Sequence, residues 1–338
     1  MTDITLNADR RSPVSLEVVI PVWNEEQVLD PLLDRLNSTF SSAAREGAGL
    51  RSVRYLFVDD GSRDHTAEIL AGRIAGGLPG VLYRLSRNFG HQNAVSAGLE
   101  YSRADVVSIL DADLQDPPEL VYRMLDRWRE GYDVVYAQRR RREGNAFKRA
   151  GYWLFYRLVA LLADIHIPLD SGDFCLMDRR VVRRLCALPE KLRFPRGLRA
   201  WVGFRQTGVE YDRPARRAGR SKYTLARLYR LATDGVISSS VRPLQLAQVF
   251  SVSYLLLTVG LGLLMLVRHV VWPAGGVTLP VLVGYLLVLS GNFVQVLCIY
   301  ILGAYVGRTY LEVKGRPPYV LMEVVGGGET PAPADRDG

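Results

Sequence analysis

The chain has 338 residues, of which 43 are Lys or Arg and 35 are Asp or Glu, so its formal net charge is +8. This length allows one large domain or two ordinary ones, and an apolar fraction of 48% excludes wholesale disorder. The three cysteines (Cys175, Cys186 and Cys298) are widely spaced, which predicts reduced thiols and neither a zinc site nor a disulfide framework. Residues 1–15 have no apolar core of signal-peptide length, so we expect a flexible N-terminus that is not a secretion signal.

Short apolar runs alternate with segments of helical spacing in the first part of the chain. The expected strands are 16–23, 53–58, 81–85, 105–110 and 133–137. The expected helices are 26–45, a helix from about Asp64, a helix into which RNFGHQNAVSAGLEY (87–101) leads, and one around 117–130. This alternation predicts an α/β fold with a mainly parallel sheet. Polar clusters follow the strands directly, at the sheet edge where open α/β folds bind ligands.

The pattern changes after residue 138. Residues 139–163 begin with a basic loop and continue as an apolar, aromatic segment, which predicts a helix at a membrane interface. Further short elements are expected in 164–223, and residues 224–243 predict an amphipathic juxtamembrane helix. We therefore expect one cytoplasmic domain over 16–223, followed by a membrane segment.

Two segments without a charged residue, 244–267 and 279–306, predict transmembrane helices, because about 20 residues cross ~30 Å of hydrocarbon. Basic residues flank the outer ends of both segments, whereas the loop between them carries only Arg268 and His269. By the positive-inside rule, we expect the domain and both chain ends to be cytoplasmic. Residues 307–338 are expected to be a cytoplasmic tail with a disordered end.

The strongest candidate site is the sequence Asp111-Ala112-Asp113-Leu114-Gln115, directly after an apolar strand. Two carboxylates and an amide oxygen at alternating positions can converge on one divalent cation. Hard oxygen ligands suit Mg²⁺ or Mn²⁺, which also bind diphosphate oxygens. The alternative interpretation is a solvated acidic turn.

Two further polar clusters, 21–25 and 59–62, follow the first and second expected strands. Their carboxylates could accept hydrogen bonds from a base N–H and from ribose hydroxyls, with Trp23 as an apolar wall. The alternative is a set of helix-capping turns, since Ser62 and Asp64 are good N-cap residues.

The sequences PVWNEE, FVDDGSRDHT, RNFGHQNAVSAGLEY and SILDADLQDPPEL, in this order, resemble glycosyltransferase family 2. Within it the chain resembles the polyprenyl-phosphate hexose synthases, which include dolichol-phosphate mannose synthase and bacterial undecaprenyl-phosphate glucosyltransferases. The resemblance runs from about residue 16 to 310 and includes LDSGDFCLMDRRVV, RGLRAWVGFRQTGVEYDR and GRSKY. It implies a GT-A-type nucleotide-sugar-binding domain, with amphipathic interface helices and two C-terminal transmembrane helices, as in the bacterial branch.

The resemblance also implies roles for individual residues. The metal and diphosphate site would comprise Asp111, Asp113 and Gln115, with Mg²⁺ or Mn²⁺ as cofactor. The nucleotide pocket would comprise Pro21, Trp23, Glu25 and Asp59, together with Asp111 and Asp113. Relatives often carry Tyr where this chain has Trp23.

A third group of residues would serve the sugar and the acceptor. Asp173 is the implied base or sugar-orienting group, and Asp170 is the runner-up; the alternative is a structural Asp in a glycine turn. A lipid phosphate is already anionic, which reduces the need for a strong base. The acceptor phosphate would bind Arg139, Lys148, Arg149, Arg220 and Lys222. For Arg139, Lys148 and Arg149 the alternative is a general patch for anionic lipids, and for Arg220 and Lys222 it is a juxtamembrane charge anchor.

These observations predict an inverting, metal-dependent transfer of a hexose from a nucleotide sugar to undecaprenyl phosphate, in a bacterial plasma membrane. UDP-glucose is the best choice of donor by resemblance, while GDP-mannose or a modified sugar such as aminoarabinose stays open. Tetramers occur among relatives. A processive polysaccharide synthase fits less well, because RAWVG at 199–203 is not the QxxRW motif and two spans are few. A non-catalytic membrane scaffold would leave the acidic motifs unexplained, and a nucleic-acid-binding protein would leave the spans unexplained.

Overall fold

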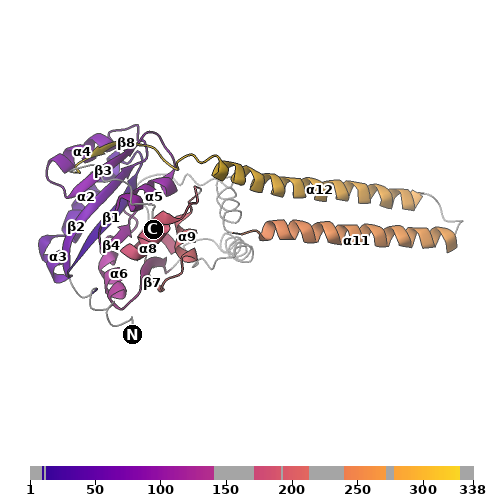
Figure 1. Ribbon diagram of the computed structural model, residues 1–338, viewed down its shortest axis with the longest axis horizontal. Helices are drawn as coiled ribbons and strands as arrows, with labels where there is room; N and C mark the ends of the chain where they lie inside the picture. Colours follow the sequence, from indigo (N-terminus) through magenta and orange to yellow (C-terminus); the bar gives the residue numbers. More distant parts are fainter. Residues whose placement is uncertain are drawn as a thin grey trace. The chain divides into compact units, whose positions relative to one another are not determined.

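The computed structural model describes residues 10, 13–140, 171–191, 193–212, 240–271 and 278–327. The chain divides into two compact units (Figure 1), each of which is described by itself. The first unit comprises Met1–Trp153, His166–Tyr223 and Arg316–Gly338, and the second comprises Leu154–Ile165 and Thr224–Gly315.

The first unit is built on an eight-stranded sheet with the strand order β7-β5-β6-β4-β1-β2-β3-β8. The strands are β1 (Val14–Val22), β2 (Leu50–Asp59), β3 (Gly80–Leu85), β4 (Val106–Ile109), β5 (Val134–Arg139), β6 (Ser171–Asp178), β7 (Gln206–Tyr211) and β8 (Leu321–Val325). Strand β6 runs antiparallel to β4 and β5, and β8 runs antiparallel to β3. The other pairs are parallel, so the predicted mainly parallel α/β sheet is confirmed.

Helices cover both faces of the sheet, which explains why its central strands are apolar on both sides. One core joins the sheet to α2 (Glu26–Thr39), α4 (Thr66–Ala75) and α6 (Leu120–Arg129). The other core joins it to α5 (His91–Tyr101) and α8 (Arg179–Ala187). On β1, consecutive residues Val18, Val19 and Ile20 are all fully buried because they alternate between these two cores.

Helix α5 lies very close to the sheet, and a glycine makes this approach feasible. A Cβ atom at Gly98 would lie 2.2 Å from Cγ1 of Val19, a distance that no side chain can occupy. The close packing fixes the N-terminus of α5, which begins at His91, near the carboxyl ends of the parallel strands.

One helix prediction needs a small correction, and one region left unspecified can now be described. The expected helix 26–45 is interrupted after Thr39, and a separate short helix, α3 (Ser42–Gly47), follows. The unspecified short elements of 164–223 include β6, α8, α9 (Pro195–Trp201) and β7.

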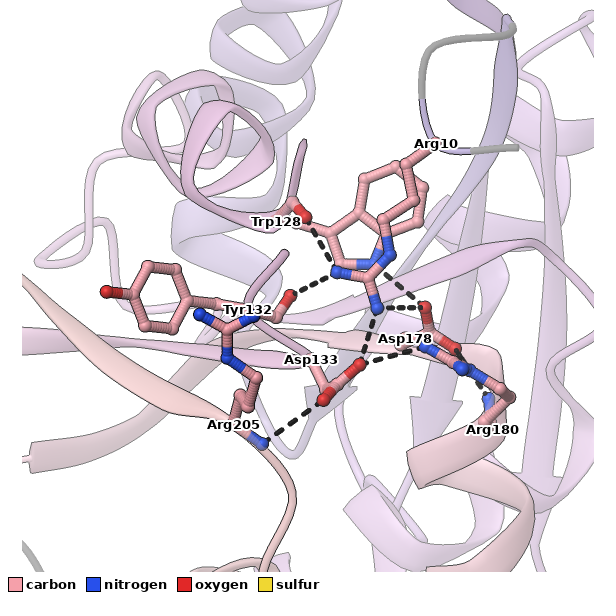
Figure 2. Close-up of polar contacts among 7 residues, drawn as sticks. All are labelled: Arg10, Trp128, Tyr132, Asp133, Asp178, Arg180 and Arg205. Atoms are coloured by element: carbon pink, nitrogen blue, oxygen red, sulfur yellow. Dashed lines mark hydrogen bonds and ion pairs between the residues drawn. The ribbon is translucent and has the colours of Figure 1, made fainter. Parts of the chain in front are cut away.

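The expectation of a flexible N-terminus through residue 15 is wrong at its end, because β1 already begins at Val14 and Arg10 is buried. Figure 2 shows Arg10 among the acidic side chains of Asp133 and Asp178. Its Nη1 also donates to the carbonyls of Trp128 (2.8 Å) and Tyr132 (3.0 Å). Arg10 therefore joins the N-terminal segment to α6, β5 and β6.

The expectation of a simple tail after residue 306 is also wrong in part. Residues 307–313 continue the long helix α12, and residues 321–325 form the edge strand β8 of the sheet. Figure 1 shows β8 in yellow beside β3, at the end of the sheet that the first part of the chain builds. The tail thus contributes to the first unit.

The second unit contains two long helices, α11 (Arg242–Val271) and α12 (Thr278–Val313). They pack on each other: the hydroxyl of Tyr254 donates to the carbonyl of Leu287, and Ser251 Oγ lies 3.5 Å from Cys298 Sγ. Both helices are long and apolar enough to cross a membrane. They contain the predicted spans 244–267 and 279–306. The predicted juxtamembrane helix lies almost wholly outside the described residues, as does the predicted interface helix.

Candidate active site

The carboxyl ends of three neighbouring strands bring the acidic motifs together. In the order β4-β1-β2, each strand is followed directly by one of the clusters identified in the sequence. Backbone hydrogen bonds extend the pairing into these clusters, from Asp60 N to Val22 O and from Leu110 N to Val19 O, both at 2.9 Å. The edge predicted to bind a ligand therefore carries all three motifs.

The loops after β1 and β2 hold each other in place. Ser62 Oγ accepts from Asn24 N (2.9 Å), and Asn24 Oδ1 accepts from Arg63 N (2.8 Å). Asn24 has a φ of 53°, and this pair of bonds supports its left-handed conformation. Asp64 accepts from Glu26 N (3.2 Å) and Thr66 N (3.1 Å), so it serves the first turns of two helices. Asp64 thus satisfies N–H groups in the first turns of both helices, although the N-cap residue of α4 is His65, whereas Ser62 bonds to the other loop.

These loops place the four predicted nucleotide-pocket residues on adjacent strand ends. Pro21 lies within β1, and Trp23 and Glu25 follow it; the Trp23 side chain stays 43% exposed and offers its ring as a surface. Asp59, the last residue of β2, is 1% exposed, and its Oδ1 accepts a hydrogen bond from Ser62 N (3.0 Å). The remaining carboxylate oxygen, Oδ2, lies 3.7 Å from Arg84 Nε.

Asp60, which the sequence did not single out for a role of its own, positions the third loop. Its two carboxylate oxygens accept from Phe89 N (2.7 Å) and Gly90 N (2.9 Å). Burial raises the pKa of Asp60, although these two hydrogen bonds oppose the shift. Since Gly90 immediately precedes α5, Asp60 fixes where His91 enters the site.

The turn after β4 holds the predicted metal ligands. Asp113 Oδ1 accepts from Gln115 N (3.1 Å), and Leu114 between them has a φ of 59°. Asp111 Oδ1 is buried and has no hydrogen-bond donor among the described residues. Burial raises the pKa of Asp111 to about 6, and the nearby carboxylates of Asp173, Asp116 and Asp113 add to this effect.

The carboxylate oxygens of this site are ligands of the kind that a divalent cation prefers. An unsatisfied buried carboxylate among other carboxylates is what a bound Mg²⁺ or Mn²⁺ neutralises. Among the described residues, no three His, Cys, Asp or Glu side chains are grouped closely enough to hold a metal ion by themselves. A cation at Asp111 would therefore need further oxygens, such as those of a bound diphosphate or of water.

Asp173 lies beside Asp111 because of the antiparallel pairing between β4 and β6. The pairs run from Val106 with Asp178 to Ile109 with Cys175, and two more steps in the same register bring Asp111 opposite Asp173. Asp173 is 6% exposed. The structure thus brings the predicted sugar-site carboxylate to the predicted metal-site carboxylate, although the residues are far apart in sequence.

Three side chains, not predicted to have a role in the site, surround Asp173. Arg196, from α9, donates from Nε to Oδ1 (2.6 Å) and from Nη2 to Oδ2 (3.0 Å). Gln92 Nε2 donates to Oδ2 (3.3 Å). His91 Nε2 lies 3.4 Å from the same oxygen and 3.6 Å from Asp111 Oδ1, so the imidazole bridges the two carboxylates.

The charges of this cluster determine what each group can do. Burial alone would raise the pKa of Asp173, but Arg196 and His91 outweigh it and hold the pKa well below its usual range. For His91, burial is opposed by the carboxylates of Asp173 and Asp111, and the net effect raises the pKa of the imidazole. Asp173 is therefore a weak base whose geometry suits orienting a neighbour or stabilising positive charge.

Arg139, the predicted acceptor-phosphate residue, is the last residue of β5 and pairs with Tyr211 of β7. Its Nε is buried and makes no hydrogen bond within the part of the chain that the structure describes. Gly172 precedes Asp173, and a Cβ atom added at Gly172 would lie 3.6 Å from Arg139 Nη2. Arg139 thus lies near Asp173. The other predicted residues, Asp170, Lys148, Arg149, Arg220 and Lys222, lie outside the described residues.

Comparisons with known proteins identify the family of the chain. Residues 17–186 match the family model for glycosyl transferase family 2. The chain is 39% identical over 321 residues to the uncharacterized glycosyltransferase YkcC of Bacillus subtilis, covering 93% of this chain and 95% of that protein. It is 34% identical over 316 residues to the bactoprenol glucosyl transferase of Shigella phage SfII, covering 92% and 98% respectively.

A third relative is the prophage bactoprenol glucosyl transferase homolog of Escherichia coli K12, with 33% identity over 315 residues, 92% of this chain and 99% of that protein. Among solved structures, the chain is similar to glucosyl-3-phosphoglycerate synthase from Mycobacterium tuberculosis in complex with Mg²⁺ and uridine diphosphate. That similarity has a TM-score of 0.47 and 21% identity, over 69% of this chain and 80% of the other. From the family match and the near full-length identities, we conclude that the chain belongs to glycosyl transferase family 2 and is a glycosyltransferase with a GT-A-type fold.

Proposed function

We propose that this glycosyltransferase moves a hexose from a nucleotide sugar to a polyprenyl phosphate. Its similarity to bactoprenol glucosyl transferases extends over more than nine-tenths of the chain, which includes most of the two apolar helices as well as the sheet. Those helices would hold the enzyme in the membrane in which such an acceptor is embedded. The observation that carries the proposal is the meeting of Asp111 and Asp173 beside the loops of β1 and β2.

The donor would lie across the carboxyl ends of β1, β2 and β4. Trp23 and Asp59 would contact the base, and Pro21 and Glu25 would complete the nucleotide pocket. Asp111 and Asp113, with Gln115, would hold Mg²⁺ or Mn²⁺, which supplies charge neutralisation for the departing nucleoside diphosphate. UDP-glucose is our choice of donor, and GDP-mannose or a modified sugar such as aminoarabinose is the alternative.

The acceptor phosphate would attack the anomeric carbon from the face opposite the diphosphate. The new bond joins a phosphate oxygen to this carbon while the bond to the diphosphate oxygen breaks, so the configuration inverts and the product is β-linked. A phosphate anion needs no proton removed before it attacks, which is compatible with the weak basicity of Asp173. Asp173 would instead orient the sugar and stabilise the positive charge that develops at its ring. Arg139 would hold the acceptor phosphate.

The membrane arrangement follows from the same proposal. The helices α11 and α12 would cross a bacterial plasma membrane, with basic residues at their cytoplasmic ends. Lys148, Arg149, Arg220 and Lys222, predicted from the sequence, would join Arg139 at the acceptor phosphate. Both chain ends and the catalytic domain would then face the cytoplasm. By the resemblance, we also propose a homo-oligomer, with a tetramer as its expected form.

A transfer assay on the purified full-length protein tests the proposal. The assay supplies undecaprenyl phosphate and Mg²⁺ or Mn²⁺, with radiolabelled UDP-glucose, UDP-N-acetylglucosamine, UDP-galactose and GDP-mannose in parallel. Label in the organic phase with one donor identifies both the reaction and the sugar. The Asp111→Asn variant serves as the inactive control. Absence of nucleotide binding by the wild-type protein would contradict the proposal and favour a scaffold role.

A further inference from the structure

The C-terminal strand β8 occupies a specific position on the sheet. Its register with β3 pairs Leu82 with Val325, Tyr83 with Val324 and Arg84 with Glu323. Before the strand, Ser86 N donates to Val320 O (2.9 Å), and the hydroxyl of Tyr319 donates to Glu100 Oε2 (2.8 Å). Tyr319 is only 9% exposed. Both backbone and buried side-chain contacts therefore hold β8 in one register.

This register completes a row of three charged residues across the sheet. Asp59 on β2 is the register partner of Arg84 on β3, and Arg84 is the register partner of Glu323 on β8. Directly opposite residues on neighbouring strands project to the same face, so the three side chains meet. Arg84 lies between two carboxylates, one from the nucleotide pocket and one from the C-terminal strand.

The distances show which carboxylate holds the guanidinium. Nη1 of Arg84 donates to Glu323 Oε2 at 3.0 Å, whereas Nε of Arg84 lies 3.7 Å from Asp59 Oδ2. The latter distance is that of an ion pair but is too long for a hydrogen bond. A third carboxylate, Glu68, lies 3.8 Å from Nη2 and is 61% exposed. Arg84 Nε itself is buried and finds no hydrogen-bond acceptor among the residues described.

We propose that Glu323 is a positioning residue of the donor site, acting through Arg84. By holding the guanidinium, Glu323 keeps it from closing onto Asp59, so that Asp59 Oδ2 stays available to accept a hydrogen bond from the base of a nucleoside diphosphate. This inference rests on the proposed function, which places the base at Asp59. The donor site would then depend on Glu323, a residue that follows the second apolar helix, α12, in the chain.

Loss of the Glu323 charge has a defined consequence. A guanidinium released from Glu323 is drawn to the nearest buried carboxylate, and a charge-assisted Arg–Asp pair is a strong one. The pair occupies Asp59 Oδ2, and a nucleotide must break it before it binds. Nucleotide affinity therefore falls although none of the residues that contact the nucleotide is substituted.

A double-mutant cycle on nucleotide affinity tests this inference. Calorimetry measures the Kd of UDP and, separately, of GDP in the presence of Mg²⁺, for the full-length protein. The proteins compared are wild type, Glu323→Gln, Arg84→Gln and the double variant. We expect Glu323→Gln to raise the Kd roughly fivefold in the wild-type background and to change it less than about twofold in the Arg84→Gln background.

Two further variants separate positioning from stability. Glu323→Asp keeps the charge and is expected to recover most of the affinity, and Glu68→Gln, which removes the exposed partner of Arg84, is expected to leave the Kd unchanged. Equal effects of Glu323→Gln in both backgrounds would overturn the inference and show that the strand acts only through stability. If the wild-type protein binds neither nucleotide, the proposed donor site fails and the inference fails with it.

Discussion

Arg196 donates two hydrogen bonds to Asp173, from Nε to Oδ1 at 2.6 Å and from Nη2 to Oδ2 at 3.0 Å. Such a two-point contact fixes the plane of the carboxylate as well as its charge. The same carboxylate contacts His91, which also lies 3.6 Å from Asp111. The orientation of the proposed sugar site therefore depends on a helix, α9, whose sequence belongs to the family resemblance but was assigned no role in the site.

The Arg196→Lys variant is expected to lower kcat about tenfold, and Arg196→Gln roughly a hundredfold, because a misplaced group near the reacting atoms can cost that much. The KM for the nucleotide sugar should change less than about twofold in both, since Arg196 acts on the sugar site and not on the base. Steady-state kinetics with both substrates provides the measurement. Arg184→Gln, on the exposed face of α8, is the matched control. A KM effect as large as the kcat effect would show that Arg196 instead binds the donor.

The raised pKa of Asp111 leads us to expect that stability depends on pH and on divalent cations. Its pKa is raised to about 6 in the folded protein, against about 3.9 for an unperturbed Asp. A raised folded pKa contributes stability that is fully present below about pH 4 and lost as the pH rises to about 6. Without metal, Asp111→Asn should therefore melt at a higher temperature than wild type at pH 8 but not at pH 4.

Mg²⁺ or Mn²⁺ at pH 8 should raise the melting temperature of the wild-type protein and leave that of Asp111→Asn unchanged, because only a ligand bound to the folded state stabilises it. Differential scanning fluorimetry in detergent, with and without a chelator, measures both effects. Equal stabilisation of the two proteins by the cation would exclude Asp111 as a ligand. This readout is independent of catalysis.

The sequence predicted the central strands and their motifs well because each leaves a local signal. The strands β1, β2 and β4 are mainly apolar runs that end at polar, acidic clusters. Their parallel arrangement follows from alternation with helices. The nucleotide-pocket and metal-site candidates therefore meet as expected, since consecutive motifs lie at the same edge of one sheet.

Other contacts could not be predicted because they join segments that are distant in sequence and carry no periodic signal. Strand β8 has five residues and follows two long apolar helices, so nothing local distinguishes it from a tail. The pair of Asp173 and Arg196 depends on the antiparallel register of β6 and on the position of α9. His91 gives no sequence signal for its role, because its bridging of two carboxylates depends on the pairing of β4 and β6.

Arg139 is expected to serve the acceptor and not the donor. Its Nε is buried without a hydrogen-bond acceptor among the described residues, at the carboxyl end of β5. Arg139→Ala should raise the KM for the lipid phosphate at least about tenfold, as removal of a charge-assisted contact does, and that for the nucleotide sugar less than about twofold. Initial rates over a matrix of both substrate concentrations measure the two constants. Equal effects on both would argue for a structural role of Arg139.

The Arg10→Ala variant tests whether the N-terminal segment stabilises the sheet. Arg10 is buried between Asp133 and Asp178, and Trp128 Nε1 also donates to Asp178 (3.0 Å), as Figure 2 shows. Removing Arg10 leaves the buried negative charges of two carboxylates less well neutralised. We therefore expect the free energy of unfolding to fall by about 3 kcal/mol. Urea denaturation of the detergent-solubilised protein, followed by tryptophan fluorescence, measures the change.

A suitable control for this variant is Arg180→Ala, because Arg180 pairs with the same two aspartates but its side chain is 43% exposed. A more solvated pair contributes less, so we expect a loss of at most about 1 kcal/mol. Neither substitution should change the KM of either substrate by more than about twofold, since Asp133 and Asp178 lie at the other end of β5 and β6 from Arg139 and Asp173. If Arg10→Ala destabilises the protein no more than Arg180→Ala, the buried contacts of Arg10 contribute no more than an exposed ion pair, and the N-terminal segment is not part of what stabilises the catalytic domain.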